Sequence, residues 1–223
     1  MRISEILDIK PGITALIGGG GKTTLMYTLA RELSAFGRVI ICTSTKILEP
    51  DFIPVLTDVS GEDTAAALKT SSIVCVGTKA AGGKLSAPGI GFAELEKLAD
   101  YVIVEADGAR GLPIKAHAGY EPVIPEGTNR TVTVIGADCF GKPISEICHR
   151  PELFAVLASA DIASALTPEL AARVISNEGF GDIVYINKVE TNEMMNLCRR
   201  FADSIDLPVA AGSLKTEEYI CLR

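Results

Sequence analysis

The sequence predicts an α/β fold, a doubly wound and mainly parallel β-sheet flanked by helices. Short apolar runs rich in β-branched residues alternate along the chain with segments of helical period. Several of these runs are apolar on both faces, as in Val39–Cys42 and Val102–Val104, which is typical of parallel strands covered by helices on both sides. The alternation of strand and helix implies right-handed crossovers between parallel strands.

The expected strands are short apolar runs that recur from Ile13 to the end of the chain. They cover Ile13–Ile17, Arg38–Thr43, Ser72–Gly77, Tyr101–Glu105, Thr131–Ile135, Asp182–Ile186 and Pro208–Ala210. The expected helices cover Lys22–Phe36, Gly61–Lys69, Phe92–Ala99, Pro151–Ala158, Pro168–Ile175 and Asn192–Ile205. Residues 79–91, rich in glycine and lysine, are expected to form a hairpin excursion. Residues 107–128 form a long loop, and loops of that length are usually functional.

The composition is that of one globular domain spanning residues 1–223. Hydrophobic residues make up 48% and charged residues 22%, and the net charge of −7 argues against a nucleic-acid-binding surface. No apolar run reaches the roughly 18 residues of a membrane span, and the first residues lack the apolar core of a signal peptide. The expected location is the cytoplasm, with no nucleic acid and no membrane among the partners.

A glycine-rich turn, Gly18 to Gly21, joins the first expected strand to the first helix and is followed by Lys22-Thr23-Thr24. Glycine lets backbone N–H groups converge on an anion, because no Cβ blocks the approach. The helix N-terminus adds free donors and a favourable dipole. Lys22 is predicted to reach the β- and γ-phosphates of a nucleoside triphosphate, and Thr23 to bind Mg²⁺. The nucleotide-binding residues expected here are Gly18, Gly19, Gly20, Gly21, Lys22, Thr23 and Thr24.

This turn departs from the commonest phosphate-binding loop, because Leu16 stands where G-x-x-x-x-G-K-[ST] has its first glycine. The alternatives are a plain glycine-rich βα turn and a dinucleotide-binding turn. The second alternative lacks an acidic residue at the end of the next strand, where Thr43 to Lys46 stand instead. The sequence therefore favours a P-loop NTPase fold.

Two carboxylates stand at the end of the expected strand Tyr101–Glu105 and just after it. In a parallel sheet, ligands bind at the carboxyl ends of the strands. Glu105 and Asp107 are predicted to hold Mg²⁺ or its waters and to act in catalysis, and the N–H of Gly108 to contact the γ-phosphate. The alternative is an Asp-Gly turn. The hydroxyls of residues 43–45 face the same edge and are either further ligands or helix caps.

Two later segments indicate which base is bound. Asn187-Lys188-Val189-Glu190 follows the sixth expected strand and resembles the N-K-x-D motif of GTPases, whose carboxylate accepts hydrogen bonds from guanine. Gly212-Ser213-Leu214-Lys215 follows the last strand, where GTPases carry a loop that contacts the guanine oxygen. Guanine is therefore favoured over adenine. The predicted nucleotide-binding residues in these segments are Asn187, Lys188, Glu190 and Ser213.

Cations in the long loop are candidates for a catalytic role. Arg110 is predicted to neutralise charge on the γ-phosphoryl group, as an arginine finger supplied within the chain, with Lys115 and His117 as further candidates. The alternative for each is a solvated loop charge.

A second group of polar residues follows the fifth expected strand. These residues form either a substrate or partner pocket or a set of caps and surface pairs; they are Asp138, Lys142, His149 and Arg150. Cys148 and His149 are disfavoured as a metal site, because neighbouring strand residues point to opposite faces.

Several segments together resemble the YqeC family: Gly18–Thr24, Val104–Gly111, Tyr120–Pro125, and Gly136–Asp138 with His149–Glu152. The resemblance spans nearly the whole chain. Proteins of this family are described as accessory proteins of selenium-dependent molybdenum hydroxylases. The resemblance implies a P-loop domain and a partner that is a molybdenum hydroxylase or a selenium-delivery protein.

A wider resemblance is to the GTPases that mature hydrogenase, urease and cobalamin mutases, whose E-x-x-G is matched by Glu105 and Gly108. The glycine turn is closer to the G-x-x-G-K-T-T of Mur-type ligases, which use ATP to activate a carboxylate. The expected function is Mg²⁺-dependent binding and slow hydrolysis of GTP, with ATP as the other candidate, in a maturation factor. The alternatives are an ATP-dependent ligase or transferase and a nucleotide-gated binding module without significant turnover. The oligomeric state is open, with a homodimer as one candidate.

Overall fold

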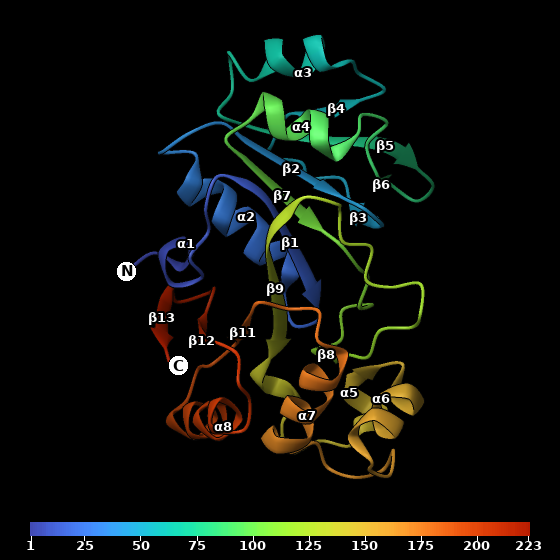
Figure 1. Cartoon of the computed structure of the whole chain (residues 1–223), viewed down its shortest axis with the longest axis vertical. Helices are drawn as coiled ribbons and strands as arrows, with labels where there is room; N and C mark the ends of the chain where they lie inside the picture. The colour runs from blue at the N-terminus through green and yellow to red at the C-terminus, as the bar shows by residue number, and fades with distance from the viewer.

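Strand β1 (Gly12–Gly18) lies inside a sheet of eleven strands, between β7 (Tyr101–Glu105) and β9 (Thr128–Gly136). All three strands run parallel, with Leu16 opposite both Glu105 and Val132. The computed structural model describes the whole chain, residues 1–223, and the sheet runs from one end of the molecule to the other (Figure 1). The glycine-rich turn that follows β1 therefore emerges at the middle of one sheet edge.

The strand order is β13-β12-β11-β9-β1-β7-β2-β5-β6-β3. The other parallel strands are β2 (Val39–Thr43), β4 (Val55–Thr57), β5 (Ile73–Ala80), β11 (Ile183–Asn187) and β12 (Val209–Ser213). Antiparallel strands complete both ends, namely β3 (Lys46–Leu48), β6 (Lys84–Ser86) and β13 (Glu218–Cys221). The predicted fold class, an α/β fold with a mainly parallel sheet, is confirmed and is consistent with a P-loop NTPase-like fold.

Helices cover both faces of the sheet (Figure 1). One face carries α1 (Ile3–Ile6) and α2 (Lys22–Leu33). The other face carries α3 (Gly61–Ala67) and α4 (Phe92–Leu98) over one half of the sheet. The second half of that face carries α5 (Ile144–Ile147), α6 (Pro151–Ala158), α7 (Pro168–Glu178) and α8 (Asn192–Asp203).

This double cover explains the apolar runs of the sequence. All five residues of β2 are buried, and neighbouring residues face opposite helix layers. Ile41 packs in the core beneath α2, whereas Ile40 packs beneath α4. Between the two helix groups, the loop at 107–128 covers β1, where its Ile124 packs against Ala15 and Ile17. The loop is thereby held next to the end of β1.

Strands β3, β4, β6 and β13, and the small parallel pair of β8 (Ile114–Lys115) and β10 (Cys148–His149), were not predicted from the sequence. Each has only two to four residues, too few to show a period, and each forms because a neighbouring strand supplies its hydrogen bonds. Within residues 79–91, β5 turns through Gly82 and Gly83, both at positive φ, and returns as β6.

The bounds of the longer elements differ from the prediction by a few residues. Helix α2 ends at Leu33 rather than Phe36, and β9 begins at Thr128 rather than Thr131. Helix α7 continues beyond Ile175 to Glu178, and that extra turn carries a residue of the site described below.

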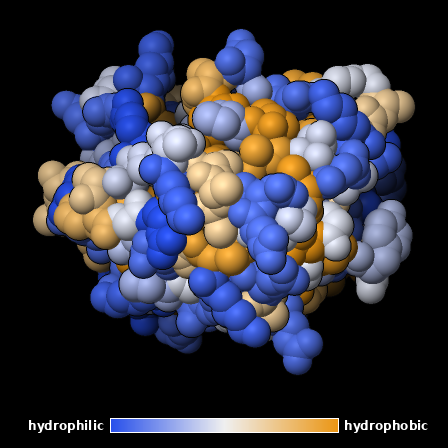
Figure 2. Space-filling model, turned by 90° about the horizontal axis from the view of Figure 1, so that it is seen from above, coloured by the Kyte–Doolittle hydropathy of each residue, from blue (hydrophilic) through white to orange (hydrophobic).

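No helix in the chain combines the length and the apolar character needed to cross a bilayer. Seen from the end that carries α3 and α4, the surface is hydrophilic at its rim, and hydrophobic residues gather toward its centre (Figure 2). Five of the six cysteines are buried, and Cys221 is exposed.

Candidate functional site

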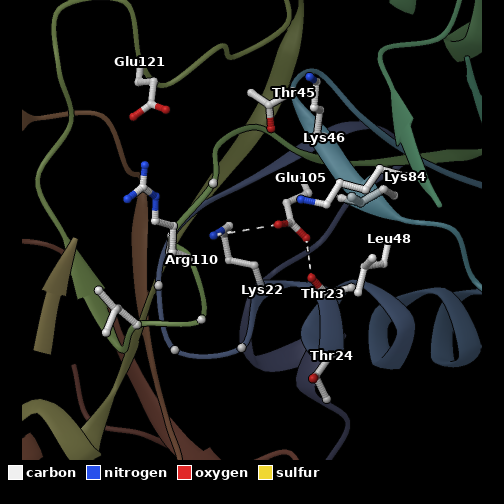
Figure 3. A pocket seen from close by; sticks show the side chains of 18 of the residues that line it. Lys22, Thr23, Thr24, Thr45, Lys46, Leu48, Lys84, Glu105, Arg110 and Glu121 are labelled. Atoms are coloured by element: carbon white, nitrogen blue, oxygen red, sulfur yellow. Dashed lines mark hydrogen bonds and ion pairs between the residues drawn. The ribbon is translucent and has the colours of Figure 1, made fainter. Parts of the chain in front are cut away.

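A cavity of about 680 Å³ opens at the carboxyl ends of β1, β2 and β7 (Figure 3). This volume lies in the range of roughly 300–1,000 Å³ that is usual for small-molecule sites. The walls come from several segments: residues 19–24, residues 45–48, Glu105, residues 108–112, and the side chains of Lys84, Glu121 and Lys188.

The glycine turn is packed tightly against β9 and against the loop at 107–128. Gly18 and Gly20 have φ of +95° and +69°. A Cβ on Gly18 would lie 2.3 Å from the carbonyl oxygen of Val134, and a Cβ on Gly20 would lie 2.2 Å from the nitrogen of Gly136. The N–H of Gly20 donates to the carbonyl of Leu112 at 3.1 Å. Both the conformation and the space therefore require glycine, and the turn is fixed before any ligand binds.

Four successive N–H groups remain free in the same segment. The backbone nitrogens of Gly21, Lys22, Thr23 and Thr24 donate no hydrogen bond within the protein. Helix α2 begins at Lys22, so these first N–H groups have no helical acceptor, and no side chain caps them. All four residues line the cavity. Free donors at a helix N-terminus form a binding site for an anion.

Thr23 and Glu105 meet next to these donors (Figure 3). The Thr23 hydroxyl donates to Oε2 of Glu105 at 2.7 Å, and Lys22 Nζ lies 3.9 Å from Oε1 of Glu105. Burial raises the pKa of Glu105, and this effect exceeds the opposing effects of Lys22 and Thr23. A hydroxyl and a carboxylate are the hard oxygen ligands that Mg²⁺ prefers. The two residues thus fit the predicted Mg²⁺ site.

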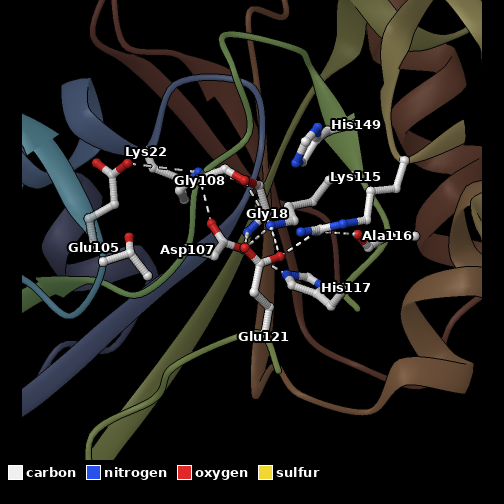
Figure 4. Close-up of polar contacts among 12 residues, drawn as sticks. Gly18, Lys22, Glu105, Asp107, Gly108, Lys115, Ala116, His117, Glu121 and His149 are labelled. Carbon is white, nitrogen blue, oxygen red and sulfur yellow. Dashed lines mark hydrogen bonds and ion pairs between the residues drawn. The ribbon is translucent and has the colours of Figure 1, made fainter. Parts of the chain in front are cut away.

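Asp107 lies behind the turn and does not line the cavity (Figure 4). It is completely buried, and its Oδ2 accepts the N–H of Gly18 at 2.8 Å and lies 2.6 Å from Nε2 of His117. Lys22 Nζ lies 3.0 Å from Oδ1, and Lys115 Nζ lies 3.4 Å from Oδ2. Burial alone would raise the pKa of Asp107, but the hydrogen bond from His117 and these two charges hold it well below its usual range. Its position is that of an anchor for the turn.

His117 extends this buried network to helix α7. Its Nδ1 lies 2.9 Å from Oε2 of Glu178, and its backbone N–H donates to Oε1 of Glu178 at 2.6 Å. Burial disfavours a charged His117 ring, but the hydrogen bonds with Asp107 and Glu178 outweigh it and raise the pKa. A continuous path of hydrogen bonds therefore joins the Gly18 backbone to the end of α7.

Lys115 holds the loop that forms one wall of the cavity. Its ammonium group donates to the carbonyl of Gly108 and to Oε2 of Glu121, both at 2.8 Å. Glu121 also accepts a hydrogen bond from Arg150. Burial would raise the pKa of Glu121, but Arg150 and Lys115 lower it. Of the three candidate catalytic cations in the loop, Arg110 therefore remains the one that lines the cavity, and it makes no ion pair or side-chain hydrogen bond.

The two segments predicted to bind the base lie side by side. The Asn187 side chain donates to the carbonyl of Gly20 at 2.8 Å and accepts the N–H of Leu214 at 3.1 Å. The N–H of Val189 donates to the carbonyl of Gly212 at 3.0 Å. Asn187 therefore ties both segments to the glycine turn.

The remaining residues of these segments differ in their surroundings. Lys188 lines the cavity and donates to Oδ2 of Asp138 at 2.8 Å. Ser213 is buried and accepts the N–H of Lys215 at 3.3 Å. Glu190 is exposed and makes no side-chain hydrogen bond.

The structure thus brings together most of the predicted residues and separates a few. Those that line the cavity are Gly19, Gly20, Gly21, Lys22, Thr23, Thr24, Glu105, Gly108, Arg110 and Lys188. Those that do not line it are Gly18, Asp107, Asn187, Glu190 and Ser213. The residues after the fifth strand do not share one pocket, because Asp138 pairs with Lys188 and Arg150 pairs with Glu121.

Three residues of this region were not predicted from the sequence: Lys84, Glu121 and Glu178. Lys84 lies on a short strand in the glycine- and lysine-rich segment, and Glu121 contacts Arg150, which is 29 residues away in sequence. Glu178 contacts His117 across 61 residues. No local pattern marks such long-range pairs.

Most residues of this site lie in a segment that matches a known protein family. The family model described as "YqeC protein" matches residues 14–152, which include the glycine turn, Glu105 and the loop at 107–128. The chain belongs to the YqeC family. The family resemblance seen in the sequence is therefore confirmed. A relative, "Uncharacterized protein YqeC" of Escherichia coli (strain K12), is 34% identical over 170 residues. The match covers 72% of this chain and 63% of that protein, so the chain spans less than two thirds of its length.

The YqeC match ends at residue 152, before β11. The glycine turn, Glu105 and the buried Asp107–His117 pair lie inside the matched region. Residues 187–190 and 212–215 lie outside the region that the family model matches, so this match gives no support to the predicted preference for guanine.

Proposed function

We propose that this YqeC family chain is a P-loop protein that binds a nucleoside triphosphate with Mg²⁺ and hydrolyses it slowly. One observation carries the proposal: four free N–H groups, at residues 21–24, line one cavity together with the ammonium group of Lys22. Backbone donors and a lysine at a helix N-terminus are the elements that hold the phosphates in such proteins.

In this proposal each charged or hydroxyl residue of the cavity has a separate role. Lys22 would exchange its contacts with Gly18 and Asp107 for the β- and γ-phosphates. Thr23 and Glu105 would hold Mg²⁺, which when bound neutralises phosphate charge. As a ligand of the ion, Glu105 would keep Mg²⁺ and its waters next to the γ-phosphate, and this is the catalytic role that we propose for its carboxylate. Arg110 would stabilise negative charge on the γ-phosphoryl group.

Glu105→Gln tests the chemical step. Loss of the carboxylate is expected to lower the rate of Mg²⁺-dependent hydrolysis about 100-fold or more, and to change nucleotide affinity much less. Phosphate release under saturating nucleotide measures the rate, and calorimetry measures the affinity. Glu62→Gln, on the exposed surface of α3, is the control and should keep the wild-type rate. Hydrolysis by Glu105→Gln at the wild-type rate would rule out a catalytic role for this carboxylate.

We further propose that the base is guanine. Asn187 joins the two base-binding segments to the glycine turn, so a base held there would be fixed relative to the phosphates. Glu190 is exposed and unpaired, and a carboxylate in that state is free to accept hydrogen bonds from guanine N1 and N2.

Glu190→Ala is expected to weaken GTP binding by about 1–3 kcal/mol, because the two guanine donors lose their acceptor. ATP binding should stay the same. Parallel calorimetric titrations of GTP and ATP on the wild type and the variant measure both affinities. Equal affinities for GTP and ATP that do not change with the substitution would favour the ATP-dependent alternative.

The wider role that we propose is that of an accessory factor for a selenium-dependent molybdenum hydroxylase, which acts on that enzyme or on a selenium-delivery protein. The chain belongs to the YqeC family, and the role follows from the resemblance to that family described in the sequence analysis, which implies an accessory protein of such enzymes. The alternatives are an ATP-dependent ligase or transferase and a nucleotide-gated binding module. One observation favours the ligase or transferase. Lys46 and Lys84 line the side of the cavity away from the base-binding segments, and neither has an ionic partner, so they are free to bind a second, anionic substrate.

A further inference from the structure

The cavity contains cationic side chains that the nucleotide site does not use. Lys46 and Lys84 line it, and neither makes an ion pair or a hydrogen bond through its side chain. The other lysines of the cavity differ, because Lys22 pairs with Asp107 and Lys188 pairs with Asp138. In a chain of net charge −7, two unpaired cations on one wall form a local positive field.

The strand register places these two lysines on the same face of the hairpin. In the antiparallel pair of β3 and β6, Leu48 lies opposite Lys84, and Ile47 lies opposite Leu85. Successive side chains of a strand alternate between faces, so Lys46, Leu48 and Lys84 share one face. Ile47 and Leu85 are buried on the other face. The hairpin is thus fixed by Ile47 and Leu85, of which Ile47 also borders the cavity, and its other face contributes two lysines and a leucine to the cavity wall.

This wall lies on the opposite side of β1 from the base-binding segments. Strands β7, β2, β5, β6 and β3 follow β1 on one side of the sheet, and β9, β11 and β12 follow it on the other. Residues 187–190 begin with the last residue of β11, and residues 212–215 begin with the last two residues of β12. A nucleotide whose phosphates lie on the glycine turn and whose base lies at Asn187 therefore extends away from the hairpin.

The hairpin wall also faces the reacting end of such a nucleotide. Figure 3 shows Lys84 extending toward Glu105 from the hairpin side, and Arg110 on the opposite side of Lys22. Thr45 contributes a hydroxyl to the same wall. Leu48 is 63% exposed although it lines the cavity, so it offers an apolar contact next to the two charges.

We propose that Lys46, Lys84, Thr45 and Leu48 form a second subsite, which binds an organic co-substrate through a phosphate or carboxylate group. The subsite presupposes the nucleotide site proposed above. Ammonium and hydroxyl groups bind the anionic group, and Leu48 contacts the apolar part of the molecule. The co-substrate then lies beside Glu105, next to the γ-phosphate.

Calorimetry tests the subsite in two steps. A non-hydrolysable GTP or ATP analogue with Mg²⁺ is first titrated into the protein of residues 1–223. Phenyl phosphate and benzoate are then titrated separately into the saturated complex, which distinguishes a phosphate-binding from a carboxylate-binding subsite. At least one probe is expected to bind. Lys46→Thr and Lys84→Thr should each weaken that binding by about tenfold or more, since each removes a charge-assisted contact. Threonine suits an exposed strand position, so the fold should be kept.

Lys79→Thr is the matched control, because Lys79 is an exposed lysine on the adjacent strand β5 that does not line the cavity. It should bind both the analogue and the probe like the wild type. If neither probe binds the saturated wild type, the subsite does not exist. If Lys46→Thr or Lys84→Thr lowers the affinity for the analogue as much as the affinity for the probe, the lysines belong to the nucleotide site, and the inference is wrong. Failure of the analogue to bind in the first titration would instead refute the nucleotide site itself, and the subsite with it.

Discussion

Lys22→Ala is expected to abolish tight binding of nucleoside triphosphates. Lys22 is the one cation of the turn itself, and removing it eliminates charge-assisted contacts with the phosphates. We expect the affinity to fall at least about 100-fold, or about 2.7 kcal/mol. Calorimetric titration of GTP and ATP with Mg²⁺ measures this loss.

The fold should survive this substitution. Asp107 loses the partner at its Oδ1 but keeps Gly18, His117 and Lys115. Circular dichroism and a cooperative thermal transition check that the variant is folded. Lys97→Ala, at an exposed position on α4, is the control and should bind like the wild type. A folded Lys22→Ala protein with unchanged affinity would show that the turn does not bind phosphate.

Asp107→Asn is expected to cause the largest loss of stability, about 3–5 kcal/mol in the free energy of unfolding. Every group around the Asp107 carboxylate is a donor or a cation, and an asparagine NH₂ group cannot accept from any of them. The substitution also removes the nearest carboxylate of Lys22, which keeps Glu105 at 3.9 Å, and leaves the buried Lys115 with Glu121 as its one carboxylate partner. Denaturant-induced unfolding measures the change.

Asp182→Asn is the control for this experiment. Asp182 also accepts a backbone N–H from a strand residue, Thr131 of β9, at 2.7 Å, but it is exposed and has no cationic partner. Its substitution should cost only about 1 kcal/mol. A loss of similar size for Asp107→Asn would mean that the buried network contributes little to the free energy of unfolding.

The same network gives stability a dependence on pH. The pKa of Asp107 is lowered on folding, so its contribution is present above the unfolded value of about 3.9 and is lost as the pH falls through the folded value. The pKa of His117 is raised, so its contribution is present below about 6.5 and is lost as the pH rises through the folded value. Both contributions are therefore complete between about pH 4 and 6.5. His117→Gln should remove the decrease in unfolding free energy on the alkaline side, whereas wild-type protein should retain it.

The sequence by itself was sufficient to predict the features that depend on the chemistry of neighbouring residues in the chain. The turn from Gly18 to Thr24 was predicted because glycine adopts positive φ without strain and lets backbone N–H groups approach an anion, and because Lys-Thr follows it at the start of a helix. The parallel sheet was predicted because neighbouring residues such as Ile40 and Ile41 are both apolar. In the structure both are buried, since a helix layer covers each face of the sheet. Glu105 was proposed as a site residue because it ends an expected parallel strand, where ligands bind in such sheets.

Tertiary structure alone decided the features that depend on which strands are neighbours. Glu105 and Asp107 are equivalent in sequence, but β7 lies beside β1 in a register that turns Glu105 toward Thr23 and Asp107 toward Gly18, 89 residues away. Glu178 meets His117 only because α7 continues one turn beyond its predicted end. Lys84 reaches the cavity because three residues of β6 pair with β3, too short a strand to show a pattern. Sequence periodicity specifies which face of an element is buried, whereas the order of strands in the sheet specifies which side chains meet.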